Sequence, residues 1–288
     1  MKGRFAPFLI IFSVLLSASV PSFSEVEISS QKTLDLKKTL LDVAVSLNGK
    51  WIFVLTDQHR ILVFSEDGNL NDEIPVDKGV NGIQVGARED MLYLIRRSDK
   101  KIQVVMIDFI EEINVLGSPL KGRSDAPVTI AVFSEFQCPY CARLVPLLEQ
   151  VLKAYTEDVR IAFKNFPLRN HRFSQKAAVA ALAAGRQGKF WEFHDLLFKN
   201  HQNLSNEKIN EIAEELALDP EMFERDRNAP EIMAIVRRDM VDGSKVGVRG
   251  TPMIFVNGRA LRHRTLEGFR NVIEKELEKL REKTESPS

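Results

Sequence analysis

Apolar residues follow two different patterns along the chain, and the change falls near residue 118. Before this point the apolar runs are short and end in turn-forming residues, which is typical of β-strands. The clearest runs are 51–55, 61–64, 91–95 and 102–106. The order of strands and turns returns after about 40 residues, a spacing found in the blades of β-propellers. Residues 25–116 are therefore expected to form a small all-β domain.

Two arrangements of this N-terminal segment stay open. A propeller closes with about four blades, whereas residues 25–116 have length for two. The alternatives are a pair of blades, favoured by the blade-like turn at 46–51, and a small antiparallel sandwich. The segment shows neither a metal-ligand cluster nor a phosphate-binding loop in its sequence. We therefore expect it to serve in docking, dimerisation or spacing.

A linker and an α/β pattern follow. Residues 117–127 combine glycine, proline and charged residues, a composition typical of a linker. From residue 128 to 284 the apolar periodicity switches between that of strands and that of helices. The expected elements are a strand at 128–136, a helix at 138–155, a strand at 159–166, a helical block at 172–247, a hairpin at 253–262 and a closing helix from 266. This order predicts an α/β domain over 128–284.

The first 24 residues predict a secretory signal peptide. Lys2 and Arg4 precede an apolar run at 5–16, and small residues end the segment at Ser24. An uncleaved membrane anchor is the alternative, but the run is shorter than the roughly 20 residues that cross a bilayer. We therefore expect a periplasmic or otherwise exported protein, with cleavage near Ser24.

Composition narrows the classes of function. The 40 Lys and Arg are balanced by 40 Asp and Glu, so the chain lacks the basic excess of an electrostatic nucleic-acid-binding protein. It has only two cysteines, which are too few for a disulfide-rich scaffold or a four-cysteine zinc site. Any chemistry of these two cysteines is expected to involve both of them.

Cys138 and Cys141 lie where the first strand of the α/β domain gives way to a helix. The unpaired N–H groups and the dipole at a helix N-terminus stabilise a thiolate, the nucleophilic form of cysteine. Pro139 suits the first helical turn because its nitrogen carries no hydrogen that would need a partner. Cys138 is therefore the expected nucleophile. Cys141, one turn further along, is placed to resolve a mixed disulfide on Cys138.

Two other roles for the cysteine pair find less support in the sequence. A zinc site would need two more ligands, and the downstream histidines 171, 194, 201 and 263 are scattered. A structural disulfide that closes so short a loop would contribute little stability, because that contribution grows with loop length. The sequence therefore predicts a redox-active dithiol with no metal and no cofactor.

Residues 118–284 resemble the DsbA-like branch of the thioredoxin superfamily, whose members are exported thiol–disulfide oxidoreductases. The segments that carry the resemblance are D-A-P-V-T-I at 125–130, F-S-E-F-Q at 133–137 before C-P-Y-C, N-F-P-L at 165–168, Q-G-K-F-W at 187–191 and G-T-P at 250–252. The resemblance implies a thioredoxin-like fold in which the helical block is an insertion. With the N-terminal segment, the expected fold class is an α/β thioredoxin-like domain preceded by a small all-β, propeller-blade-like domain.

The resemblance also implies roles for residues around the cysteines. Pro252 would be a cis-proline that faces the active site, and Thr251 would offer its backbone to an extended substrate peptide. Pro139 and Tyr140 would support the site between the two cysteines. Because Tyr140 brings no positive charge, the pair is expected to be a mild oxidant, with a potential of roughly −230 to −180 mV.

One position departs from the pattern of many relatives, which carry a buried acid six residues before the nucleophile. Here that residue is Val132. Strand alternation places Glu135 on the opposite face, where we expect a surface residue, and we expect Lys164 to be exposed as well. His171 and His194 are expected to be packed or surface histidines, and the aromatic residues 190, 191 and 193 are expected in the core of the insertion.

The sequence therefore predicts an exported enzyme that oxidises, reduces or isomerises disulfides in protein substrates through Cys138 and Cys141. Its partners would be protein or peptide thiols and disulfides and a redox partner protein, without nucleic acid. The N-terminal domain is a candidate for homodimerisation. The alternative function is a binding or scaffold protein whose N-terminal domain recognises a partner, with the thioredoxin-like domain as a carrier.

Overall fold

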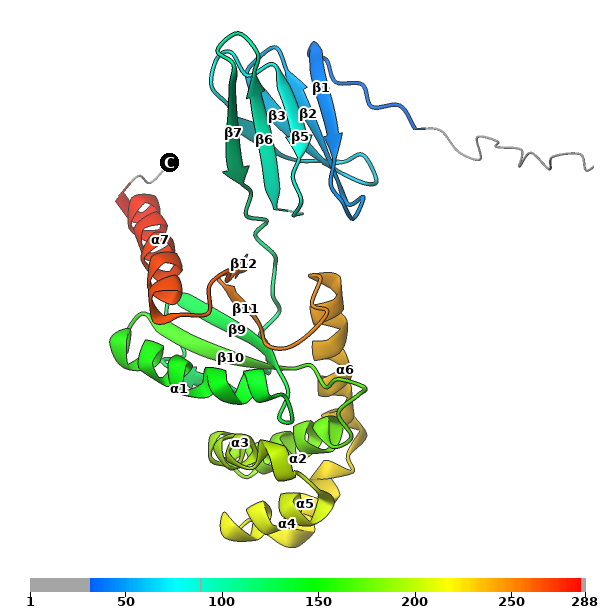
Figure 1. The fold of residues 1–288 in the computed structure, drawn as a ribbon. Coiled ribbons are helices and arrows are strands. Elements are labelled where there is room, and N and C mark those ends of the chain that lie inside the picture. Colours follow the sequence, from blue (N-terminus) through cyan, green and yellow to red (C-terminus); the bar gives the residue numbers. More distant parts are fainter. Residues whose placement is uncertain (1–31, 89, 286–288) are drawn as a thin grey trace, which may run out of the picture. The chain divides into compact units, whose positions relative to one another are not determined.

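The computed structural model describes residues 32–88 and 90–285, which fall into two compact units divided between Val104 and Val105 (Figure 1). The predicted signal peptide at 1–24 lies outside the described residues. Among the residues described, no helix combines the length and the apolar character needed to cross a membrane.

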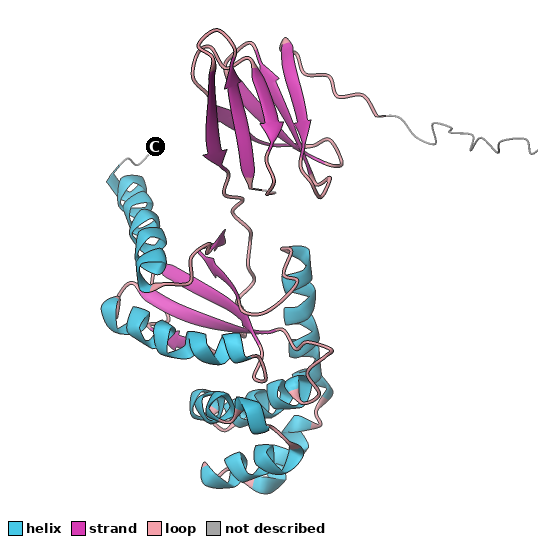
Figure 2. Cartoon of the chain, in the orientation of Figure 1, coloured by secondary structure: helices cyan, strands magenta, loops and turns pink. Residues whose placement is uncertain are grey.

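The first unit consists of two β-sheets without helices in its described part (Figure 2). The first sheet has the order β1-β2-β3-β4 and the second has the order β5-β6-β7. The strands are β1 Leu40–Val45, β2 Trp51–Thr56, β3 Arg60–Ser65, β4 Leu70–Pro75, β5 Gly82–Val85, β6 Met91–Arg96 and β7 Lys101–Met106. The division between the units falls within β7, whose last two residues belong to the second unit. The prediction of a separate all-β domain is confirmed, and its described strands form neither a closed propeller nor a barrel.

Burial on both faces explains why β2 and β3 are apolar runs rather than alternating sequences. Their paired residues Phe53 and Val63, together with Leu55 and Ile61, are buried on one face. On the other face, three buried side chains pack against the segment before β1. These are Val54, Leu62 and Phe64, and they contact Leu34 and Leu36. A strand covered on both sides has no polar face to alternate with its apolar one.

The second unit contains a five-stranded sheet of order β12-β11-β9-β10-β8. Its strands are β8 Leu120–Gly122, β9 Val128–Ser134, β10 Val159–Asn165, β11 Met253–Val256 and β12 Arg259–Ala260. Strands β9 and β10 are parallel and joined by a helix, whereas the other pairs are antiparallel. Strand β8 comes from the segment whose composition predicts a linker, and it pairs with β10 at one edge of the sheet.

Helices cover the sheet and form a separate layer. They are α1 Pro139–Ala154, α2 Ser174–Arg186, α3 Phe190–Lys199, the 3-10 turn η1 His201–Asn203, α4 Asn206–Glu215, α5 Pro220–Arg227, α6 Pro230–Lys245 and α7 Leu266–Glu285. Helices α1 and α7 pack on one face of the sheet, where alternate residues of β9 point toward them. Helix α6 packs on the other face with Phe133 and Phe255. The predicted order of β-α-β, helical block and β-β-α is confirmed.

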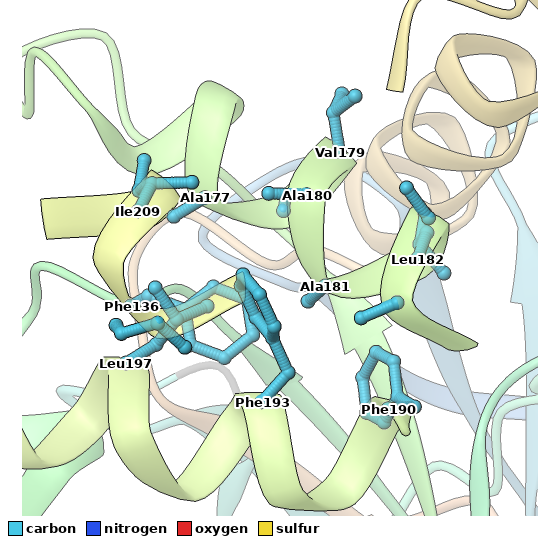
Figure 3. Close-up of a cluster of buried hydrophobic side chains, with 14 of the residues drawn as sticks. Phe136, Ala177, Val179, Ala180, Ala181, Leu182, Phe190, Phe193, Leu197 and Ile209 are labelled. Carbon is cyan, nitrogen blue, oxygen red and sulfur yellow. The ribbon is translucent and has the colours of Figure 1, made fainter. Parts of the chain in front are cut away.

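The helices between β10 and β11 share one apolar core (Figure 3). Its centre is the alanine-rich helix α2, whose residues 177–184 are all buried and contact α3, α5 and α6. Short alanine side chains let neighbouring helices pack closely around it. The prediction that Phe190 and Phe193 belong to this core is confirmed, and the same core includes Phe136 and Leu197. The insertion is thus joined to the segment that precedes the cysteines.

A buried ion cluster fixes α6 to the sheet and corrects the expectation for Lys164. This side chain is fully buried, and its Nζ lies 2.7 Å from Asp239 Oδ1 and 2.9 Å from Asp242 Oδ2. It also donates to the backbone oxygen of Asn114 at 2.8 Å. Asn165, the next residue of β10, donates through its backbone and side-chain amides to Asp239. The expectation of an exposed Lys164 is wrong because two carboxylates from α6 compensate its charge inside the protein.

Candidate active site

Both cysteines lie at the N-terminus of α1, as the sequence predicts. Strand β9 ends at Ser134, and Cys138 is the N-cap residue, with extended backbone angles of φ −73° and ψ 118°. Pro139 occupies the first helical position. The carbonyl oxygen of Cys138 accepts hydrogen bonds from the backbone N–H groups of Cys141 and Ala142, both at 3.1 Å. Cys138 and Cys141 are free thiols, 3% and 1% exposed.

The fold brings Thr251 and Pro252 to Cys138 across 113 residues of sequence. The Cys138 thiol donates to the backbone oxygen of Thr251 at 3.5 Å, and the peptide bond between Thr251 and Pro252 is cis. Thr251 and Pro252 directly precede β11, which pairs with β9. The pairing of these two strands therefore sets the loop before Pro252 against the start of α1. This is the juxtaposition that the resemblance implies.

The environment separates the acidities of the two thiols. A hydrogen bond from the Cys141 thiol, with further contributions from Thr251 and from helix N–H groups, lowers the pKa of Cys138 to about 5, although burial opposes this shift. Burial raises the pKa of Cys141, and its hydrogen bond to Cys138 adds to this. At neutral pH Cys138 is thus a thiolate and Cys141 a thiol, the division of roles that a nucleophile and a resolving cysteine need.

Tyr140 is the exposed member of the C-P-Y-C segment. It is 61% exposed, and the guanidinium carbon of Arg143 lies 4.6 Å from the centre of its ring. This cation–π contact, one turn into α1, orients the ring at the surface beside the cysteines. Arg143 is not among the predicted site residues, although its spacing of three residues from Tyr140 on a helix indicates the contact.

Glu135 is buried beside Cys138, which corrects the expectation of a surface residue. It is 1% exposed, and its carboxylate accepts from the backbone N–H of Gln137 at 2.9 Å. Its other oxygen lies 2.5 Å from Nδ1 of His171. Burial raises the pKa of Glu135 above its ordinary value, and these two contacts offset only part of that rise. The alternation argument failed because β9 ends at Ser134, so that residue 135 lies in the turn after the strand.

His194 is a packed histidine, as expected. It is 5% exposed and lies among the rings of Phe136, Phe163, Trp191 and Phe198, with centroid distances of 4.8 to 5.8 Å. Its Nδ1 lies 2.7 Å from Asp195 Oδ1. Burial lowers the pKa of His194, although Asp195 opposes the shift. The imidazole is thus neutral at neutral pH.

Comparison with known proteins gives the class of the second unit. A family model described as thioredoxin matches residues 115–275. The chain belongs to the thioredoxin family. A sheet with a parallel β9–β10 pair, a helix that starts at the C-x-x-C segment and a cis-proline loop opposite it agree with this assignment.

Solved structures show the same fold. BdbD from Bacillus subtilis superposes with a TM-score of 0.53 at 24% identity, over 59% of this chain and 98% of BdbD. The thiol–disulfide exchange protein α-DsbA2 from Wolbachia pipientis gives 0.50 at 22% identity, over 56% of this chain and 87% of that protein. The predicted DsbA-like thioredoxin fold is confirmed.

Curated relatives by sequence are larger proteins. The Na(+)/H(+) antiporter NhaA 1 of Salinispora arenicola is 37% identical over 156 residues, which are 54% of this chain and 24% of the antiporter. The matched part of this chain thus spans about a quarter of that relative's length.

Within the described residues no group of three or more His, Cys, Asp or Glu side chains is arranged to hold a metal ion.

Proposed function

We propose that this chain is an exported protein thiol–disulfide oxidoreductase whose redox-active pair is Cys138 and Cys141. The observation that carries the proposal is the geometry of the two free thiols at the N-terminus of α1. Cys138 is stabilised there as a thiolate and lies against the backbone oxygen of Thr251. No second pair of cysteines exists in the sequence.

Each exchange follows two steps. In the oxidising direction, a substrate thiolate attacks the sulfur of Cys138 in the disulfide, and Cys141 leaves with the electron pair. A second substrate thiolate then attacks the substrate sulfur of this mixed disulfide, a bond forms between the two substrate sulfurs, and Cys138 leaves as a thiolate. In the reducing direction, the Cys138 thiolate attacks a substrate disulfide, and Cys141 attacks Cys138 to release the substrate thiolate. The low pKa of Cys138 makes it both a good nucleophile and a good leaving group.

The loop of Thr251 and Pro252 is the proposed binding edge for the substrate. An extended peptide would pair with the backbone of Thr251, close to the sulfur of Cys138. Tyr140, exposed beside the pair and contacted by Arg143, offers an aromatic surface to the same peptide. The proposed substrates are therefore protein or peptide thiols and disulfides, with a separate redox protein restoring the pair.

Export is part of the proposal because a disulfide persists outside the cytosol. The sequence at 1–24 supports it, with its charged start, apolar run and small-residue end.

Two cysteine variants test the catalytic assignment. Cys138→Ser is expected to abolish reduction of insulin disulfides and reoxidation of reduced ribonuclease, because no other thiolate is placed at the site. Cys141→Ser is expected to accumulate mixed disulfides on Cys138, visible by mass spectrometry, because nothing resolves them. Activity of Cys138→Ser at the level of the unmodified chain would refute the assignment.

A binding role for the N-terminal unit is the second candidate, and exposed apolar strands favour it. Val43 and Val45 on β1 are 44% and 52% exposed, and Ile102 and Val104 on β7 are 68% and 55% exposed. Strands β1 and β7 each lie at the end of their sheet. Exposed apolar edge strands are sites of pairing with another chain, and we propose that this unit binds a partner protein or a second copy of this chain.

A truncated chain that starts at Val105 separates the two roles. It keeps the whole of the second unit, including residues 110–122, which contact β10 and β12. We expect unchanged reduction of insulin together with loss of a dimer or of a bound partner in sedimentation. An unchanged oligomeric state and an unchanged set of bound partners would refute the binding role.

A further inference from the structure

A small cavity lies beside Cys141, and the apolar side chain of Val132 forms part of its lining. It has a volume of about 20 Å³, enough for about one water molecule. Its lining includes Cys141, Ser134, His194 and Val132. The Ser134 hydroxyl donates toward Cys141 and lowers the pKa of that thiol, against the stronger effect of burial. Val132 brings no titratable group to the cavity, whereas His194 brings a base.

The geometry of His194 suits it to accept a proton there. Its Nδ1 lies 2.7 Å from a carboxylate oxygen of Asp195, and a carboxylate accepts hydrogen bonds, so Nδ1 carries the hydrogen. The lone pair of the neutral ring is then on Nε2. Four aromatic rings hold the imidazole in this orientation. Asp195 is half exposed and connects the pair to solvent.

The other titratable groups around His194 are few. Lys121 on β8, Glu149 on α1 and Cys141 on α1 line the same cavity. Lys121 and Glu149 form an ion pair with each other. Lys121 also lies 4.0 Å from Asp195. Glu149 is thus the other group that could accept a proton in this cavity, although Lys121 balances the negative charge of its carboxylate.

We propose that His194, oriented by Asp195, accepts the proton of Cys141 through one water in this cavity when Cys141 attacks a mixed disulfide on Cys138. The inference rests on the proposed function. The Cys141 S–H bond breaks, its proton passes to Nε2, and the Cys141 sulfur forms a bond to the Cys138 sulfur. The bond between Cys138 and the substrate sulfur breaks, and the substrate leaves as a thiolate. Both cysteines are then oxidised, the substrate sulfur is reduced, and the imidazolium returns its proton to solvent at Asp195.

Ellman's reagent separates the two cysteines in one stopped-flow experiment on the reduced chain. The first released thionitrobenzoate reports the attack of Cys138, and the second reports the attack of Cys141 on the resulting mixed disulfide. His194→Gln is expected to slow the second phase by about tenfold or more at neutral pH and to leave the first phase unchanged. The slowed phase is expected to accelerate with hydroxide concentration across the neutral range, whereas the unmodified chain reaches a plateau once His194 is neutral.

Two further variants complete the test. Glu149→Gln, on the same cavity, is expected to leave both phases unchanged. Asp195→Asn is expected to slow the second phase with less disturbance of the core, and it replaces His194→Gln should that variant lose its far-ultraviolet circular dichroism. A second phase that is unaffected in both the His194 and Asp195 variants, an equal slowing of both phases, or a slowing by Glu149→Gln instead would overturn the proposal. If the unmodified chain formed no mixed disulfide at Cys138, the proposed function itself would fail.

Discussion

Cys138, the proposed nucleophile, lies at a helix N-terminus, and this position follows from the sequence. The spacing of Cys138 and Cys141 and the proline between them predict a thiolate followed by a resolving thiol. The structure adds Thr251, 113 residues away, whose contact with Cys138 no local pattern could indicate. It also adds the contact between His171 and the buried Glu135, a residue that the alternation of strand residues assigned to the surface.

The alkylation rate of Cys138 should rise with pH around a midpoint far below that of an ordinary thiol. The hydrogen bond from Cys141, with those from Thr251 and the helix, places the pKa of Cys138 at about 5, so iodoacetamide should react at a constant rate above that pH. Peptide mapping assigns the rate to Cys138, and Cys141→Ser serves as a comparison. Since the Cys141 thiol is the largest contributor, its replacement should raise the midpoint. A midpoint near 9.0, the value of an ordinary thiol, in the unmodified chain would contradict this assignment.

The same shift makes the stability of the reduced chain depend on pH. The pKa of Cys138 is lower in the folded chain than the unfolded value of 9.0, so the unfolded chain binds more protons between about pH 5 and 9. The free energy of unfolding of reduced protein should therefore rise with pH in this window, and the gain should be lost as pH falls through about 5. Cys138→Ala should remove this part of the pH dependence in urea titrations. A Cys138→Ala profile parallel to that of the reduced parent would contradict the assignment.

At the scale of elements, order and type were predictable from periodicity, but the burial of charge was not. The alternating and amphipathic patterns of the second unit give its strands and helices, because each element buries one face. Lys164 lies in a strand whose neighbours are all buried, and its partners Asp239 and Asp242 come from α6. Their spacing of three residues places both acids on one face of a helix, yet nothing in the local sequence connects them to β10.

Lys164→Met should destabilise the second unit strongly. Removal of the ammonium group leaves Asp239 and Asp242 with a buried negative charge, at an expected cost of about 3–5 kcal/mol. Far-ultraviolet circular dichroism in urea measures this loss, because the described helices all belong to the second unit. Lys189→Met, which removes an exposed pair with Glu192, is the matched control and should change little. A loss no larger than that of the control would show that the cluster contributes little to the anchoring of α6.

At the scale of the whole molecule, the sequence predicts two folded parts but not the course of the chain between them. Glycine, proline and charge at 117–127 are typical of a linker, whereas the structure uses Leu120–Gly122 as the edge strand β8. A three-residue strand has too few positions to show a period of two. Upstream, Ile110 bridges to Arg259, and Asn114 accepts from the buried Lys164. The compact catalytic unit therefore begins at Val105, before the composition changes.

The central claim is that Cys138 and Cys141 exchange a single disulfide with protein thiols. A redox titration of the full chain in glutathione buffers, with alkylation of free thiols and mass spectrometry at each point, tests it most directly. The account predicts one two-electron transition between roughly −230 and −180 mV, because Tyr140 adds no positive charge beside the thiolate. A transition near about −120 mV would contradict the mild-oxidant prediction. Two cysteines that both remain open to alkylation across the whole range would contradict the claim itself.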